Sequence, residues 1–316
     1  MAKHVLITGG AGFIGSHLSE ALLATGNRVT VLDNFDDFYS PEAKRQNIAP
    51  LLSNPNFTLV EGDIRSKADL SKLPTGIDAV VHLAARAGVR PSINLPELYE
   101  DVNVKGLLNM LEFARAQGIK QFVFASSSSV YGNNPQVPWR EDLNLREVIS
   151  PYAATKLAGE HFGSVYSHLY GMRFIALRLF AVYGPRQRPD LALNKFSQQL
   201  LAGQEVTLYG DGSTSRDYTY VGDIVAGFVA ALNYTQSNFE VFNIGNSQTV
   251  MLLELLEAIE AAFGKKAIRQ FMEEQPGDVT TTYSDISKAG KLLGYKPQTS
   301  LQQGIQAFKA WWEGLS

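Results

Sequence analysis

The sequence predicts an α/β protein with a doubly wound parallel sheet and a smaller mixed α/β lobe. Short apolar runs alternate with segments of helical period over about the first 180 residues, a pattern typical of βαβ units. The apolar runs contain few polar residues, as expected of strands that helices cover on both faces. The chain of 316 residues is longer than one hydrophobic core usually supports, so a second lobe is expected.

Six apolar runs are expected to form the strands of this sheet. They lie at residues 5–8, 28–32, 58–61, 79–83, 121–126 and 174–179. Segments of helical period between them predict helices at 13–25, 99–116 and 152–170. Gly26, Gly118 and Gly171 follow these helices, and glycine is the residue that most often ends a helix.

The composition changes near residue 185 to irregular segments rich in Gly, Asp, Arg and Pro. Residues 1–184 are therefore assigned to the first domain and residues 185–316 mainly to the second lobe. Two helices, at 252–263 and 301–313, are expected in that lobe. A helical pattern at 221–231 and an apolar run at 241–244 indicate that a segment of about 218–246 returns to the first domain.

The composition excludes several kinds of function. The 28 Lys and Arg residues nearly balance the 31 Asp and Glu residues, so neither nucleic acid nor a membrane surface is expected as a partner. The chain has no cysteine, which excludes disulfides and thiolate chemistry and fits a cytoplasmic location. No stretch approaches the ~20 apolar residues of a membrane span. His82 and His161 have no metal-site spacing, so no metal is expected.

A glycine-rich turn follows the first strand and opens the first helix. Its sequence is TGGAGFIG at residues 8–15, and the order strand, turn and helix is typical of a Rossmann-type dinucleotide site. Gly9 and Gly12 are expected to let the backbone approach a pyrophosphate, and Gly15 to let helix and strand pack closely. The alternative is a glycine-rich turn that binds nothing.

Two aspartates follow the next strands. Asp33, before Asn34, has the position of the acid that accepts hydrogen bonds from an adenosine ribose. A carboxylate there repels a 2′-phosphate and therefore favours NAD over NADP. Asp63, before Ile64, is a candidate contact for the adenine edge. An ordinary turn role is the alternative for both aspartates.

A Tyr-x-x-x-Lys pair begins the helix at 152–170. Ser150 is expected to cap this helix, which places Tyr152 and Lys156 one turn apart. We expect the ammonium to lower the pKa of the phenol, so that Tyr152 can act as a base near neutral pH. Serines at 126–129 end the fifth strand, at the sheet edge where ligands bind. A solvated helix face and a polar loop are the alternatives.

The motifs TGGAGFIG, HLAARAGV, SSSSVYG, YAATK and RLFAVYGPRQRP resemble the extended short-chain dehydrogenase/reductase family of nucleotide-sugar epimerases and dehydratases. The resemblance runs from Lys3 to the C-terminal helix. It implies a tightly bound NAD, with Tyr152 as the base, Lys156 as its pKa partner and Ser127 sharing the sugar O4. The implied cofactor contacts are Gly9, Gly12, Phe13, Ile14, Gly15, Asp33, Asn34, Asp63, Ile64, Leu83, Ala84 and Ala85, with Tyr152 and Lys156.

The resemblance also indicates which reaction to expect. Dehydratases of the family carry an acid and a base after the catalytic serine or threonine, and related decarboxylases carry Glu at the second of these positions. This chain has Ser128 and Ser129 there, which favours C4 epimerisation through a 4-keto sugar. The motifs are most similar to those of UDP-glucuronate 4-epimerases, which interconvert UDP-glucuronate and UDP-galacturonate.

Substrate contacts are expected from arginines and serines. Guanidinium groups bind diphosphate in a bidentate way, and Arg186, Arg188 and Arg216 stand in matching motifs. An exposed charge is the alternative for each arginine. The resemblance implies the following substrate-binding residues: Ser127, Ser128 and Ser129 for the sugar and its C6 carboxylate, Arg216 for the phosphates, Arg188 for the phosphates or the sugar, and Lys195, Leu208, Tyr209 and Asp278 for the nucleotide.

Other functions stay open at this point. Arg86 stands where relatives often have Gln, and Ala181 where they have Thr or Asn, so a UDP-glucose/UDP-galactose 4-epimerase is one alternative. A UDP-glucuronate decarboxylase, another dehydratase-type enzyme and a non-catalytic nucleotide-binding or redox-sensing protein are the others. The helices at 99–116 and 152–170 form a homodimer contact in the family, although an intramolecular contact would also bury their apolar faces.

Overall fold

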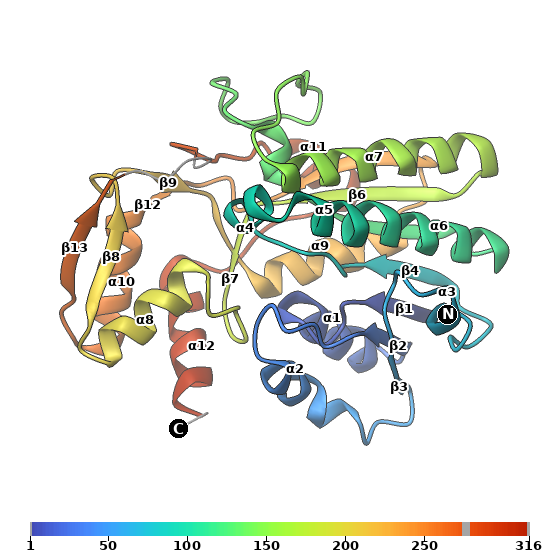
Figure 1. The fold of residues 1–316 in the computed structure, drawn as a ribbon, viewed down its shortest axis with the longest axis horizontal. Helices are drawn as coiled ribbons and strands as arrows, with labels where there is room; N and C mark the ends of the chain where they lie inside the picture. The colour runs from blue at the N-terminus through green and yellow to red at the C-terminus, as the bar shows by residue number, and fades with distance from the viewer. Residues whose placement is uncertain (1, 274–278, 315–316) are drawn as a thin grey trace.

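A computed structural model describes residues 2–273 and 279–314. Its centre is a seven-stranded parallel sheet with the order β11-β6-β5-β4-β1-β2-β3 (Figure 1). The strands are β1 (His4–Thr8), β2 (Arg28–Asp33), β3 (Phe57–Glu61), β4 (Ala79–His82), β5 (Gln121–Ser127), β6 (Arg173–Leu179) and β11 (Phe239–Ile244). The predicted strands and the doubly wound fold class are confirmed.

Successive residues of each strand pack on opposite faces of the sheet. Val5 and Ile7 of β1 belong to a hydrophobic cluster with α1 (Phe13–Ala24) and α9 (Val221–Asn233), whereas Leu6 belongs to a second cluster. That second cluster includes side chains of α6 (Gly106–Ala116) and α7 (Pro151–Tyr170), which lie side by side in Figure 1. Burial on both faces explains why the strands lack polar alternation.

The second lobe has its own hydrophobic cluster, formed by α8 (Ala192–Leu201), β8 (Glu205–Tyr209), α10 (Leu252–Phe263) and α12 (Leu301–Glu313). The helices α10 and α12 confirm the prediction, but α8, β8 and β13 (Ile268–Met272) were not predicted. All five residues of β13 are exposed, and its apolar residues Ile268, Phe271 and Met272 do not alternate with polar ones, so no strand pattern reveals it. Residues 221–244 supply α9 and β11 to the large sheet layer, and the domain division at residue 184 stays a prediction.

The remaining elements are short. They are α2 (Pro41–Ile48), η1 (Ala49–Leu51), α3 (Lys67–Leu70), α4 (Val89–Asn94), α5 (Pro96–Glu100), η2 (Asp101–Lys105), η3 (Ser128–Tyr131), β7 (Ala181–Tyr183), β9 (Ser215–Arg216), β10 (Tyr218–Tyr220), β12 (Val250–Met251) and α11 (Ser287–Leu293). Among all these described helices, none is long and apolar enough to cross a membrane.

The helix predicted at 99–116 is confirmed, since α5, η2 and α6 form one uninterrupted helical run over residues 96–116. Its middle turn, η2, is π-helical, which was not predicted. Within this turn the Asn103 amide bonds to the backbone of Arg86 and to the Thr155 hydroxyl. The wider π-helical turn therefore places the Asn103 side chain between α7 and the loop after β4. The apolar pattern of the sequence continues through this turn and does not reveal it.

A buried ion pair ties α7 to the sheet. Arg178 of β6 bonds to both carboxylate oxygens of Glu160, at 2.9 and 2.7 Å, and to the Tyr131 hydroxyl at 3.0 Å. Glu160 also accepts a 2.5 Å hydrogen bond from Ser126 of β5. The pair is thus fully hydrogen bonded, as a buried charge requires, and it fixes the serine-bearing end of β5 against α7.

The contact of α7 with the sheet depends on Gly163, because a Cβ there would lie 2.1 Å from the Phe174 ring. We expect Gly163→Ala to lower the free energy of unfolding by about 1–3 kcal/mol through overpacking. Gly290→Ala is the matched control, since its Cβ would meet nothing closer than 3.6 Å and alanine favours a helix. Urea unfolding measures both, and equal effects would contradict the packing argument.

Candidate active site

The carboxyl ends of the central strands open into one cavity of about 560 Å³. Every residue predicted to contact the cofactor lines it: Gly9, Gly12, Phe13, Ile14, Gly15, Asp33, Asn34, Asp63, Ile64, Leu83, Ala84, Ala85, Tyr152 and Lys156. Ser127 lines it as well. Because parallel strands all end at one edge of the sheet, residues far apart in the sequence meet there.

Helix α7 positions two of the candidate catalytic side chains. The Ser150 hydroxyl caps this helix by accepting from the Ala153 backbone N–H at 3.1 Å. One turn apart, Lys156 lies with Nζ 5.8 Å from the centre of the Tyr152 ring and donates to the Ala125 carbonyl at 2.7 Å. The ammonium is thereby held between the end of β5 and the tyrosine.

Ser127 supplies the third candidate catalytic group. Its hydroxyl accepts from the Ser129 backbone N–H at 3.2 Å and donates to the Ser129 hydroxyl at 3.1 Å. These bonds begin the turn η3 and fix the Ser127 hydroxyl at the end of β5. Ser127, Tyr152 and Lys156 therefore line the cavity together at the carboxyl end of β5, as their predicted cooperation requires.

The electrostatics of this trio differ from the prediction. Burial raises the pKa of Tyr152, and the Ser127 hydroxyl and the Arg188 guanidinium lower it only in part. Burial lowers the pKa of Lys156 to about 7. The expectation that the Lys156 ammonium lowers the pKa of Tyr152 is therefore wrong for the chain by itself, because burial disfavours the charged form of both groups.

The glycine-rich turn is held by close backbone contacts. Gly9 has a φ of +70°, and a Cβ there would lie 2.8 Å from the Ala84 backbone nitrogen. A Cβ at Gly15 would lie 2.4 Å from the Gly9 carbonyl oxygen, so Gly15 packs against the turn itself and not against a strand as predicted. The glycine that packs on a strand is Gly10, whose Cβ would lie 2.5 Å from Val31.

Asp33 lies beside this turn. Its two carboxylate oxygens accept from the backbone N–H groups of Ala11 at 3.0 Å and Phe35 at 2.9 Å. Burial raises the pKa of Asp33, although these N–H groups oppose the shift. A carboxylate has about four acceptor positions, so two remain for ribose hydroxyls.

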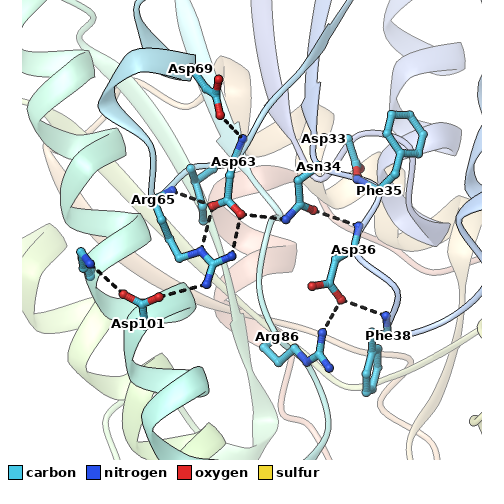
Figure 2. A network of polar contacts seen from close by, with 12 residues as sticks. Asp33, Asn34, Phe35, Asp36, Phe38, Asp63, Arg65, Asp69, Arg86 and Asp101 are labelled. Atoms are coloured by element: carbon cyan, nitrogen blue, oxygen red, sulfur yellow. Dashed lines mark hydrogen bonds and ion pairs between the residues drawn. The ribbon is translucent and has the colours of Figure 1, made fainter.

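Asp63 has a different environment, which Figure 2 shows. Its carboxylate accepts from Asn34 at 2.9 Å and from the Arg65 side chain at 2.7 and 3.0 Å, and Arg65 continues to Asp101. Burial raises the pKa of Asp63, but the hydrogen bonds from Arg65 and Asn34 outweigh this effect and hold the pKa below its ordinary value. These bonds fix Asp63 as part of the cavity wall.

The cavity fits a dinucleotide. The first turn of α1 follows the glycine-rich turn and directs its backbone N–H groups toward the cavity side, where an anion is favoured. Two buried polar atoms of cavity-lining residues, Tyr39 Oη and Arg86 Nε, have no hydrogen-bond partner in the described chain. The described residues contain no group of three or more His, Asp or Glu residues that could hold a metal ion.

The predicted sugar contacts surround a second cavity of about 250 Å³. Ser128 lines this side cavity, and Ser127, Ser129 and Arg216 line both cavities. Arg188 lines the main cavity and forms a bidentate pair with Asp190 at 2.8 and 2.9 Å. Among the described side chains that line the side cavity, none is a carboxylate.

Arg186 does not join the other arginines. It pairs with Glu20 of α1 at 2.6 Å and lines neither cavity, so the expected grouping of three arginines is wrong for this residue. Because Glu20 lies far from Arg186 in the sequence, the spacing of the motif could not reveal this ion pair.

The predicted nucleotide contacts Lys195, Leu208 and Tyr209 lie in the second lobe, outside the lining of both cavities. Leu208 is fully buried, and Tyr209 lies under two cations, with Arg90 at 4.6 Å and Lys195 at 5.8 Å from its ring centre. Arg90 was not among the predicted residues. Asp278 lies outside the described residues.

The cavity also contains residues that the sequence analysis missed, above all Phe38, Tyr39 and Lys44. All three follow β2, where no motif marks them. Their position directly after a parallel strand was the available signal, because such loops lie at the ligand-binding edge. Aromatic residues in a loop after Asp33 were therefore candidates on topology alone.

The buried lysine predicts a pH-dependent stability. Folded Lys156 loses its proton near pH 7, whereas an unfolded lysine keeps it until about 10.5, so the unfolded chain binds the extra proton between these values. The free energy of unfolding of cofactor-free protein should therefore rise with pH in this window, by at most about 1.4 kcal/mol per pH unit.

Urea unfolding at pH 7, 8 and 9 measures this rise. Lys156→Met should lack this contribution. Lys105→Met, which removes an exposed lysine paired with Asp101, should keep the wild-type profile. Parallel profiles for the wild type and Lys156→Met would show that Lys156 does not titrate in this window.

Comparisons with known proteins extend along almost the whole chain. Residues 6–308 match the family model of GDP-mannose 4,6 dehydratase. A UDP-glucuronate 4-epimerase of Thermodesulfobacterium geofontis is 38% identical over 312 residues, which cover 98% of this chain and 95% of the relative.

Two solved structures are similar. The UDP-glucuronic acid 4-epimerase of Bacillus cereus, in complex with UDP-glucuronic acid and NAD, has a TM-score of 0.93 and 39% identity and covers 99% of this chain and 100% of its own. The UDP-glucose 4-epimerase of Thermotoga maritima with UDP-glucose has a TM-score of 0.91 and 32% identity, with 99% of each chain covered. The chain therefore belongs to the GDP-mannose 4,6 dehydratase-like family of NAD-dependent epimerases and dehydratases, within the extended short-chain dehydrogenases/reductases.

Proposed function

We propose that this chain is an NAD-dependent 4-epimerase that interconverts UDP-glucuronate and UDP-galacturonate. One observation carries the proposal: Ser127, Tyr152 and Lys156 line the same cavity as the glycine-rich turn and Asp33, beside a side cavity lined by serines and no described carboxylate. A base and a hydride acceptor suffice for epimerisation, whereas dehydration requires a further acid and base. The relatives from Thermodesulfobacterium geofontis and Bacillus cereus support this assignment.

The NAD-binding residues would be those of the glycine-rich turn, Asp33 and the segment 83–85, with Lys156 near the nicotinamide ribose. Two free acceptor positions on Asp33 suit the ribose hydroxyls and disfavour a 2′-phosphate. The chemistry that NAD supplies when bound is removal of a hydride from the sugar C4 and its return to the opposite face.

The chain's own residues handle the proton. Tyr152 takes the proton of the C4 hydroxyl, and Ser127 donates a hydrogen bond to the same oxygen. The phenolate that this requires is favoured by Ser127 and Arg188, the two groups that lower the pKa of Tyr152 against the effect of burial. The 4-keto sugar then rotates in the cavity so that its opposite face is presented. Tyr152 finally returns the proton to the C4 oxygen.

The substrate would be held by groups around both cavities. Arg188 and Arg216 suit the diphosphate, and Ser128 and Ser129 suit the C6 carboxylate as neutral hydroxyl donors. A 4-keto uronate is a β-keto acid that loses CO₂ readily. Neutral hydroxyl donors can hold its C6 carboxylate without supplying the acid that would protonate C5 after loss of CO₂. Lys195, Leu208, Tyr209 and Asp278 would contact the uridine.

A UDP-glucose/UDP-galactose 4-epimerase is the second candidate. Ala181 lines both cavities and offers no polar group to a carboxylate, and the Thermotoga maritima relative acts as a UDP-glucose 4-epimerase by name. A decarboxylase or dehydratase is disfavoured because positions 128 and 129 lack an acid.

Three further assignments are part of the proposal. A homodimer through α6 and α7 is supported by the exposed apolar side chains of Val165 and Leu169 on α7. A cytoplasmic location is supported by the absence of cysteine from the sequence. The division of the chain into an NAD lobe, 1–184 with 218–246, and a UDP-sugar lobe is supported by the separate hydrophobic cluster around α8 and α10.

Product analysis tests the activity. Incubation of the purified protein with UDP-glucuronate should yield UDP-galacturonate, and Tyr152→Phe should lower kcat by about 10²- to 10⁴-fold because the base is lost. Tyr166 lies on the same helix, and its hydroxyl donates a hydrogen bond to Glu112 of α6. The control variant Tyr166→Phe should therefore keep wild-type activity. Turnover of UDP-glucose in place of UDP-glucuronate would decide for the second candidate, and no turnover of either would refute both.

A charge at position 129 tests how the sugar is recognised. Ser129→Glu should lower kcat/KM for UDP-glucuronate about tenfold more than for UDP-glucose, because a second carboxylate near the first repels it. Ser129→Gln is the matched control, since it has the same size and no charge. An equal loss for both sugars in the Glu variant would place the substrate carboxylate elsewhere.

A further inference from the structure

The loop between β2 and α2 forms one wall of the main cavity. Its residues Asp36, Phe38 and Tyr39 line the cavity, as does Arg86 from the segment after β4. In the sheet, β1 lies between β4 and β2. A contact between Arg86 and this loop therefore spans the carboxyl end of β1, where the glycine-rich turn begins.

Arg86 makes that contact in two ways, and Figure 2 shows both partners. Its guanidinium forms an ion pair with the Asp36 carboxylate and lies over the Phe38 ring, 4.7 Å from the ring centre. Asp36 also accepts from the Phe38 backbone N–H at 2.9 Å. The side chains of Arg86 and Asp36 are 16% and 33% exposed, so Arg86 holds the loop through a partly buried pair, which solvent screens less than a surface pair.

Other segments hold the same loop. The guanidinium of Arg188 lies 5.2 Å from the centre of the Phe38 ring. At the start of the loop, the Asn34 side chain accepts from the Asp36 backbone and donates to Asp63. The conformation of the loop is thus set by three separate parts of the chain.

This conformation directs the Tyr39 hydroxyl at the glycine-rich turn. A Cβ at Gly12 would lie 3.7 Å from Tyr39 Oη. Burial raises the pKa of Tyr39, whereas the backbone N–H of Phe13, in the first turn of α1, lowers it. The hydroxyl is therefore protonated, buried and without a hydrogen-bond partner of good geometry, beside the helix end that favours an anion.

We propose that Tyr39 donates a hydrogen bond to the diphosphate of the bound dinucleotide, and that Arg86 is the positioning residue that holds Tyr39 there through Asp36 and Phe38. The proposal rests on the proposed function, in which this cavity binds NAD. A donor to a charged oxygen accounts for the unpartnered hydroxyl and makes release of the cofactor depend on the Arg86 contact.

The test measures how fast NAD leaves the protein. Purified protein is loaded with NAD, diluted into NAD-free buffer, and the NAD that remains bound is quantified over time after denaturation. Tyr39→Phe removes one oxygen and should raise the dissociation rate about tenfold, and Arg86→Met should raise it similarly. Arg140→Met is the control, because Arg140 forms an exposed pair with Asp142 and lines neither cavity.

The double variant separates positioning from an independent contact. If Arg86 acts through Tyr39, the double variant Tyr39→Phe/Arg86→Met loses NAD no faster than the faster single variant, because both changes remove one hydrogen bond. Multiplied effects would overturn the positioning role of Arg86. A wild-type dissociation rate in Tyr39→Phe would overturn the Tyr39 contact. Wild-type protein that binds no NAD would instead refute the cofactor of the proposed function.

Discussion

The parallel direction of the seven strands is the constraint on which the rest of the structure depends. Because every strand runs the same way, the carboxyl ends of β1, β2, β4 and β5 meet at one edge. Gly9, Asp33, Ala84 and Ser127 lie at those ends and so share one cavity. The helices on the two faces then bury the apolar side chains and leave this edge open to a ligand.

Burial at that edge determines the electrostatics of the site. Lys156 is buried and Tyr152 is half-buried in the cavity wall, and this burial disfavours the charged form of each. The structure compensates with fixed polar partners: the Ala125 carbonyl for Lys156, and Ser127 and Arg188 for Tyr152. Behind them, the buried pair of Arg178 and Glu160 keeps the end of β5 in place against α7. The side chains to which we propose to assign proton transfer are thus held by fixed contacts within the protein.

Sequence reasoning succeeded where a local pattern has only one structural explanation. Apolar runs between helical segments predicted the central strands, and the order strand, glycine turn and helix predicted the cofactor edge. It failed where a distant contact decides the outcome. The helix at 99–116 contains a π-helical turn, not predicted, where Asn103 bonds to Arg86 and Thr155, and Arg186 pairs with Glu20. Neither contact leaves a mark on hydrophobic periodicity.

The sequence by itself predicted the fold class, the dinucleotide-type turn and the meeting of Tyr152 and Lys156 with the serines that end β5, because these depend on short-range spacing and on strand ends that share one edge. Only the tertiary structure decided that burial, and not the Lys156 charge, dominates the pKa of Tyr152. It also decided that Gly10 rather than Gly15 packs on a strand, and that Arg86 reaches Asp36 across the end of β1. The reason is that desolvation and contacts between segments depend on which surfaces face each other after folding, and residue spacing along the chain does not contain that information.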